Sequence, residues 1–245
     1  MNSSSASADP APGVPYRPHI GPSRQYVRDM ILGVNDGLVS VFLLVAGVVG
    51  GGLNNRQVLV AAVAATVAGA VSMAAGEYVA TKSQEEVFDS EMELEREHLH
   101  HHRHVEQDEI REMFGEMGLS EGDVERVLQA LDRDDDAFLR VMMALEFGIV
   151  EEGRRSPITA AVLAGLLFLV GSAPSVIPFT LPIDTNTALI AAAVASLAAL
   201  FTVGVVKTRT TRRPALKSGV ENMAIAVGGS IVSYGIGSLF RISTG

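Results

Sequence analysis

The chain has no cysteine and no tryptophan among its 245 residues. Without cysteine there is no disulfide and no thiolate metal site, although the redox compartment stays undetermined. Any metal site must therefore use carboxylate, imidazole or thioether donors. Without tryptophan, an aromatic belt at a bilayer interface can come only from the four tyrosines and nine phenylalanines.

Charge is scarce over most of the chain and concentrated in one segment. Residues 82–157 carry 22 Asp and Glu against 9 Lys and Arg, a net charge of −13, together with five of the six histidines. The rest of the chain holds 6 acids and 10 bases. The overall charge of −9 thus combines one strongly acidic segment with a weakly basic remainder. We expect no nucleic-acid partner for such a chain.

Five apolar runs are long enough to cross a membrane, because a bilayer core needs about 20 mostly apolar residues per helix. These runs cover about 29–51, 57–81, 157–178, 186–206 and 219–240. The fourth run contains no charged residue. Buried helices of a soluble protein are the alternative, but a charge-free run with Gly and Ala at packing positions argues against them. The sequence therefore predicts an all-α, polytopic membrane protein with five transmembrane helices.

The composition divides the chain into four parts. Residues 1–27 are rich in Ser, Ala and Pro and predict a disordered amino-terminal arm, since a signal peptide needs an apolar run near its start. Residues 28–81 hold spans one and two, joined by a tight hairpin at about 50–55. Residues 82–156 form the acidic helical insert, and residues 157–245 hold spans three to five.

Positively charged residues predict the orientation of the spans, because they collect on the cytosolic side. They lie before span one (Arg24, Arg28), before span three (Arg154, Arg155) and, five in number, between spans four and five. The opposite side offers only Arg56 and Arg241. We therefore expect the amino terminus and the insert in the cytosol and the carboxy terminus on the far side. The short chain and its minimal tail favour a plasma membrane over a vacuole.

An ionisable group inside a predicted span is costly and indicates function. Asp36 lies in span one, and Glu77 lies near the cytosolic end of span two with Met73 one turn deeper. At 1.5 Å per residue, Asp36 and Met73 lie roughly 10 Å inside their helix ends, so an antiparallel hairpin places them at one depth. A carboxylate beside a thioether favours a divalent transition metal. The alternatives are a structural carboxylate and ordinary packing of the methionine.

Within the insert, the pattern predicts helices over about 81–103 and 105–117, a third from Ser120, and a last one from about 134 to 152. Metal-ligating residue types recur there at three- and four-residue spacing, which places them on shared helix faces. They are Glu91, Glu95, His98 and His102 on the first helix, Glu106 and Glu109 on the second, and Met142 and Glu146 on the last. Such mixed donors favour Fe²⁺, Mn²⁺, Co²⁺ or Zn²⁺ over Ca²⁺, with a solvated charged helix as the alternative.

An enzymatic site is not indicated. Glu95-Arg96-Glu97-His98 is a Glu-x-x-His element of the kind found in di-iron carboxylate bundles. Those bundles need such an element on each of two helices, which this sequence does not provide. We therefore expect no enzyme and no tightly bound cofactor.

Two short motifs, the acidic insert and the five spans together resemble the vacuolar iron transporter family over nearly the whole chain past the arm. The motifs are Asn35-Asp36-Gly37-Leu38-Val39-Ser40 in span one and Ser72-Met73-Ala74-Ala75-Gly76-Glu77-Tyr78 in span two. The resemblance implies a homodimer that exports Fe²⁺ from the cytosol in exchange for protons. It also implies that Asp36 and Met73 line the path between the subunits.

In the insert, the resemblance implies metal ligands at Glu95, Glu106, Glu109, Met142 and Glu146. Where the family has a further glutamate, this chain has His98, and the usual Pro-Glu pair is replaced by Arg103-His104. A histidine keeps a donor but removes a negative charge, and it makes the site sensitive to mildly acidic pH.

These patterns predict a proton-coupled exporter of divalent metal in a lipid bilayer, with roles in iron transport and iron homeostasis. Fe²⁺ and Mn²⁺ accept the same donors, so manganese transport is a second version of this hypothesis, and Co²⁺ or Zn²⁺ could substitute at the sites. The rival hypothesis is a membrane-tethered metal buffer or sensor without transport. That rival gives no reason for a carboxylate inside span one.

Overall fold

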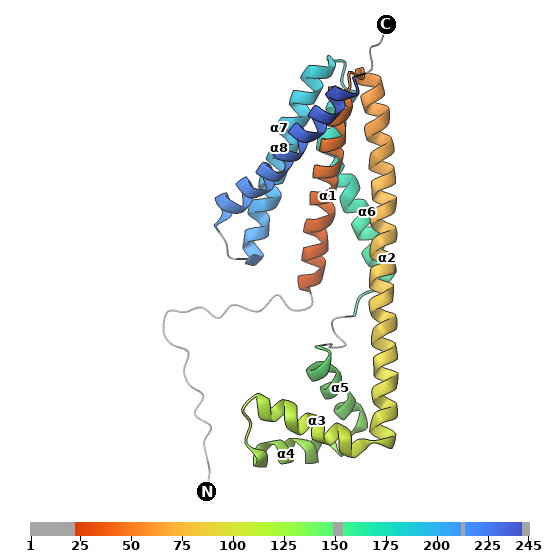
Figure 1. The fold of residues 1–245 in the computed structure, drawn as a ribbon, viewed down its shortest axis with the longest axis vertical. Helices are drawn as coiled ribbons and strands as arrows, with labels where there is room; N and C mark the ends of the chain where they lie inside the picture. Colours follow the sequence, from red (N-terminus) through yellow and green to blue (C-terminus); the bar gives the residue numbers. More distant parts are fainter. Residues whose placement is uncertain (1–22, 149–153, 212–213, 242–245) are drawn as a thin grey trace.

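In the computed structural model, the described residues are 23–148, 154–211 and 214–241, and every regular element in these ranges is helical (Figure 1). The elements are α1 (Ser23–Gly50), α2 (Asn55–His101), α3 (Arg103–Glu116), α4 (Glu121–Leu131), α5 (Asp135–Glu146), α6 (Pro157–Val176), the 3₁₀ helix η2 (Ile177–Thr180), α7 (Thr185–Thr211) and α8 (Ala215–Leu239). The first 22 residues of the expected arm lie outside the described ranges, and α1 begins within its last five.

Five of these helices, α1, α2, α6, α7 and α8, are long and apolar enough to cross a membrane. This confirms the predicted all-α class and the predicted number of spans. The hairpin between the first two is short, since α1 ends at Gly50 and α2 begins at Asn55. At its start, the Asn54 side chain accepts from the backbone N–H of Gln57, and the Gln57 side chain accepts from that of Asn54. This reciprocal cap fixes the first turn of α2.

Helix α2 is the longest element and links the two parts of the molecule. Its 47 residues extend about 70 Å, more than twice the ~30 Å of a bilayer core. Figure 1 shows its upper half beside α1 and α6 and its lower half running down to α3, α4 and α5. The first helix of the insert is therefore a direct continuation of span two, as the sequence predicts.

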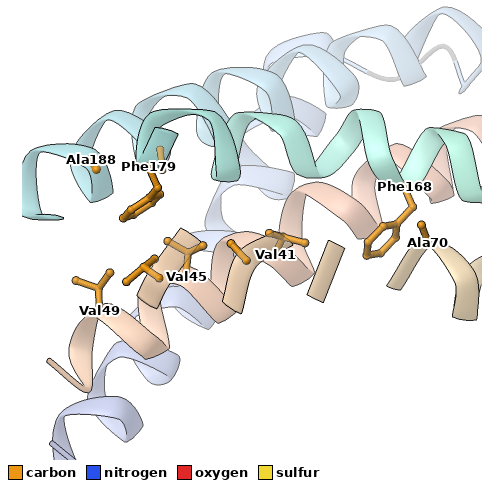
Figure 2. Close-up of a cluster of buried hydrophobic side chains, with 10 residues drawn as sticks. Val41, Val45, Val49, Ala70, Phe168, Phe179 and Ala188 are labelled. Carbon is orange, nitrogen blue, oxygen red and sulfur yellow. The ribbon is translucent and has the colours of Figure 1, made fainter. Parts of the chain in front are cut away.

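The membrane body is organised around the contact between α1 and α6. A Cβ at Gly37 would meet the backbone carbonyl oxygen of Phe168, and one at Gly171 would meet that of Val34. Small residues let helix backbones approach closely in lipid. There, packing contacts must hold the helices together, because the hydrophobic effect does not act between them. Figure 2 shows Val41 and Val45 of α1 lying between Phe168 of α6 and Phe179 of η2 in the buried core, with Val49 beyond Phe179.

Helices α3, α4 and α5 close on the end of α2 around a second core. This core consists of Leu99, Ile110, Val124, Leu128, Phe138 and Met142. Side chains cap two of the helices, because Ser120 accepts from the N–H of Asp123 and Asp134 accepts from those of residues 136 and 137. The last helix is shorter than the predicted 134–152. It ends at Glu146, and Gly148 takes a left-handed φ of +64° that stops the helix.

Candidate metal sites

The sharp turn between α2 and α3 builds the first candidate site. His102 joins the two helices with φ −131° and ψ 28°, outside helical geometry. The chain reverses there, so Glu106 on the first turn of α3 faces Glu95 and His98 on the last turns of α2. Within the described ranges, these three residues are the only group of three or more His, Asp or Glu side chains close enough to hold one metal ion.

The three donors form a compact set. One ligand atom from each of them lies within 4.8 Å of the others. His98 Nδ1 is 3.4 Å from Glu106 Oε1 and 4.0 Å from Glu95 Oε1. Both carboxylates are buried, with Glu95 5% and Glu106 2% exposed, whereas His98 is partly open to solvent. A divalent ion with two carboxylates and one imidazole matches this donor set.

Two oxygen atoms of this site lack the partners that buried polar atoms normally have. Glu95 Oε2 and Glu106 Oε2 are buried without a hydrogen bond among the described residues. Burial, and then the charge of Glu106, raises the pKa of Glu95 to about 7. Burial and the neighbouring Glu109 likewise raise the pKa of Glu106. A bound cation would supply the missing partner and remove the repulsion between the carboxylates.

The remaining insert candidates lie around this group in different ways. Glu146 on α5 is close enough that burial and the charges of Glu95, Glu109 and Glu91 raise its pKa. Met142 is 1% exposed and belongs to the apolar core under the site. His102 is exposed, with its ring centroid 6.5 Å from that of His98. The acidic residues thus lie close to one another and to His98, whereas Met142 packs in the apolar core.

The raised pKa values predict how the metal-free insert responds to pH. A carboxyl group whose pKa rises on folding favours the folded state below its unfolded value near 4.5, and that contribution is lost as the pH rises through about 7. We expect backbone amides at the α2–α3 junction to exchange hydrogen faster at pH 7 than at pH 4.5, after correction for intrinsic rates. Adding Mn²⁺ at pH 7 should restore protection in the detergent-solubilised full chain.

Glu95→Gln is the matched variant for this experiment, because it keeps the shape but cannot ionise. It should flatten the pH response and weaken the effect of Mn²⁺. Equal protection at both pH values in the unsubstituted protein, with and without metal, would contradict the assignment.

A cavity of about 440 Å³ between α1, α2 and α6 forms the second candidate site. Asp36, Met73 and Glu77 all line it, so the two helices do place these residues together. Ser40 donates a hydrogen bond of 2.9 Å to Asp36 Oδ1. The other lining residues are Leu32, Val41, Leu44, Ala65, Gly69, Ser72, Gly76 and Phe168. The cavity therefore offers two carboxylates, a thioether and hydroxyl groups within an otherwise apolar wall.

The three residues of the motif Asn35-Asp36-Gly37 face three different neighbours, because successive residues of a helix are rotated by about 100°. The Asn35 Oδ1 atom accepts a hydrogen bond of 3.3 Å from Asn222 Nδ2 on α8. Asp36 faces the cavity, and Gly37 lies against the backbone of α6. Each residue of the motif thus makes a separate contact that accounts for its residue type.

A buried ion pair next to Glu77 of the cavity was not predicted from the sequence. Asp29 of α1 is 4% exposed, and it forms an ion pair with Arg155, which is 8% exposed. Arg155 also reaches Glu77, with Nη2 3.4 Å from Oε1. Asp29 lies seven residues before Asp36, two helical turns away on the same face of α1. This spacing could have indicated from the sequence that Asp29 lies on the same side as Asp36.

Five apolar helices, three of which line a cavity with two carboxylates, and an acidic helical unit with a three-donor group define an integral membrane protein with places for divalent metal. The sequence profile of the VIT family matches residues 27–238. The chain belongs to this family.

Characterised relatives cover most of the chain. It is 31% identical over 210 residues to vacuolar iron transporter 1 of Arabidopsis thaliana, with 86% of this chain and 84% of that protein covered. Vacuolar iron transporter 2 of Oryza sativa subsp. japonica is 32% identical over 213 residues, 86% of each chain. The vacuolar iron transporter of Toxoplasma gondii is 30% identical over 237 residues, 93% of this chain and 78% of that protein. These names refer to the vacuole, which weighs against the plasma membrane expected from the sequence.

Proposed function

We propose that the protein is a proton-coupled exporter of divalent metal, chiefly Fe²⁺ and also Mn²⁺, with a role in iron homeostasis. The observation that carries this proposal is the cavity in which Asp36, Met73 and Glu77 meet. Relatives named as iron transporters support iron as the cargo. The donor types suit a late divalent metal over Mg²⁺ or Ca²⁺.

The cavity favours transport over a tethered metal buffer. A buffer needs donors only in the insert, where metal can bind from water. Two carboxylates in the membrane body are costly and serve no purpose in an anchor. In a transporter, Asp36 holds the metal in one state and a proton in the other, because protons and metal compete for the same carboxylate.

The insert captures metal for this path. Glu95, His98 and Glu106 form the centre of the capture site, with Glu109, Glu146 and Glu91 as neighbouring acids that add negative charge. Helix α2 carries Glu95 and His98 of the capture site and Met73 of the cavity, so one continuous helix connects the two sites.

The exposed faces of the membrane body support a homodimer. Within one copy, only 17% of the apolar window of α2 and 6% of that of α8 is buried, against 44% for α6. Lipid can cover such apolar faces. The cavity is different, because Ser40, Ser72 and Gly76 on its wall are exposed in the single chain. A second copy over α1 and α2 would shield these polar atoms from hydrocarbon.

The positive residues support an orientation with α3, α4 and α5 in the cytosol. Arg154 and Arg155 at the start of α6 lie on the same side as the insert. Helix α8 ends on the opposite side, at the upper end of the molecule in Figure 1.

Ion-dependent proton movement tests the proposal. Vesicles containing the full chain would be given Fe²⁺ or Mn²⁺ on the side of the insert, with a pH indicator and a metal-quenched fluorophore trapped inside. Exchange of metal against protons should raise the lumenal pH as metal enters. Metal entry with no pH change would remove proton coupling, and the two ions measured in turn identify the preferred cargo.

Glu106→Gln should weaken metal capture by the insert about 10- to 100-fold, because it removes a charged ligand from a buried donor set. Metal flux should fall at low metal concentration and recover at high concentration, since the cavity residues are unchanged. Equilibrium binding of Mn²⁺ to the full chain measures the first effect.

Glu112→Gln is the matched control on the same helix, because Glu112 is exposed and lies outside the three-donor group. It should bind and transport metal as the unsubstituted protein does. Equal loss in both variants would mean that the insert attracts metal only through its overall negative charge.

A further inference from the structure

A cluster of three charges adjoins the cavity through Glu77. Arg155 at the start of α6 contacts Asp29 of α1 and Glu77 of α2. The side chains of these three residues are 6%, 5% and 15% exposed, respectively. The cluster joins three helices that are far apart in the sequence, and it contains one positive and two negative charges.

The two contacts of Arg155 are unequal. Its Nη1 atom forms the closer contact, with Asp29 Oδ2, and its Nη2 atom lies 3.4 Å from Glu77 Oε1. Asp29 has a further partner in Arg28, whose Nη2 is 3.2 Å away and whose side chain is 69% exposed. The arginine is therefore anchored on Asp29 and shared with Glu77.

Glu77 belongs to the cluster and to the cavity at the same time. It lines the cavity with Asp36 and Met73, and its Oε1 atom accepts a hydrogen bond of 3.3 Å from Thr81. Both contacts that the described residues make with this carboxylate use Oε1. A metal that ligates Glu77 from the cavity must therefore share the negative charge of this carboxylate with the guanidinium, and the two cations repel each other.

We propose that Arg155 is a positioning residue that acts as a built-in competitor of the metal at Glu77. This inference rests on the proposed transport function. Arg155 occupies Glu77 when the cavity holds no metal, and it withdraws onto Asp29 when the metal arrives. The guanidinium then returns to Glu77 and helps to release the metal, so the site binds its cargo without retaining it.

Asp29 is what makes this exchange feasible. Removing one partner from a buried ion pair normally leaves an uncompensated charge, which is strongly unfavourable. Here Arg155 keeps a carboxylate partner in both states, and Glu77 exchanges a guanidinium for a metal ion. A single arginine between two acids thus avoids an unpaired buried charge at either step.

Opposite effects on apparent metal affinity test this inference. Arg155→Gln removes the competitor and should lower the KM for Fe²⁺ about tenfold, with a reduced maximal rate because release slows. Asp29→Asn removes the anchor, so Arg155 binds Glu77 more firmly and the KM should rise by a similar factor. Arg155→Lys keeps the charge and should return the KM toward that of the unsubstituted protein. In a Glu77→Gln background, Arg155→Gln should no longer change the KM.

Arg154→Gln is the control, because Arg154 lies in the same connection but pairs with Glu85 and Asp89 on the surface of α2. It should leave the KM and the maximal rate unchanged. If the cluster were merely structural, Arg155→Gln and Asp29→Asn would both lower the thermal stability and leave the KM unchanged. That result overturns the inference. If Arg155→Gln fails to fold, Asp29→Asn and Arg155→Lys decide the question. Absence of metal flux in the unsubstituted protein would instead overturn the proposed function itself.

Discussion

Replacing Asp36 by asparagine should reduce the initial rate of metal flux into vesicles at least about 100-fold, which corresponds to about 3 kcal/mol in the barrier. Asparagine has nearly the same shape, so packing against Ser40 and α2 is kept. The amide has no negative charge to hold a divalent ion and no site that exchanges metal for a proton. Flux of Fe²⁺ into vesicles containing the full chain measures this effect.

Two controls make the Asp36 result specific. Binding of Mn²⁺ by the insert should be unchanged, because the three-donor group lies outside the membrane body. Asp184→Asn makes the same chemical change at the start of α7, where the side chain accepts from the N–H groups of Asn186 and Thr187. Asparagine caps helices equally well, so this variant should transport normally. Normal flux in Asp36→Asn would remove the cavity from the mechanism.

Gly37→Ala should destabilise the membrane body by about 2–3 kcal/mol, as overpacking of a close-packed interior does. The added methyl group would meet the backbone carbonyl oxygen of Phe168 and then the backbone nitrogen of Ser172, both on α6. Backbone atoms cannot turn aside as a flexible side chain can, so the helices must separate. Thermal unfolding of the detergent-solubilised protein should show a clear drop in Tm.

Gly228→Ala is the matched control for this packing prediction. A Cβ at Gly228 meets nothing within 4 Å, and the residue lies within α8, outside the cavity and away from the face of α1 and α2. Alanine is favoured over glycine in a helix by about 0.5–1 kcal/mol, so stability should stay the same or rise slightly. Equal Tm values for Gly37→Ala and the unsubstituted protein would show that α1 and α6 do not depend on this close approach.

Much of the fold follows from hydropathy alone. A run of about 20 apolar residues is a strong signal because a bilayer leaves no other partner for the backbone, and all five predicted spans are helices. The extension of α2 into the insert also follows, since no proline interrupts it between Asn55 and His101. The end of α5 did not follow, because the effect of Gly148 depends on a local backbone conformation.

The candidate sites were predictable only where one helix carries the signal. Three- and four-residue spacing put Glu95 and His98 on one face, and the turn at His102 added Glu106. Met142 shows the limit of this reasoning, because a methionine at ligand spacing can equally face an apolar core, and here it does. The ion pair of Asp29 and Arg155 joins residues 126 positions apart, so only the packing of α1 against α6 reveals it.

The number of metal ions that accumulate per protein tests the central claim most directly. Sealed vesicles containing the full chain, with an inwardly directed Fe²⁺ gradient and an outwardly directed proton gradient, would be assayed for lumenal iron over time. Transport through the cavity of Asp36 and Met73 predicts continued uptake to many ions per protein, and a much lower rate in the Asp36→Asn variant. Uptake that saturates at a few ions per protein, equal in both proteins, would contradict transport and identify a membrane-tethered metal buffer.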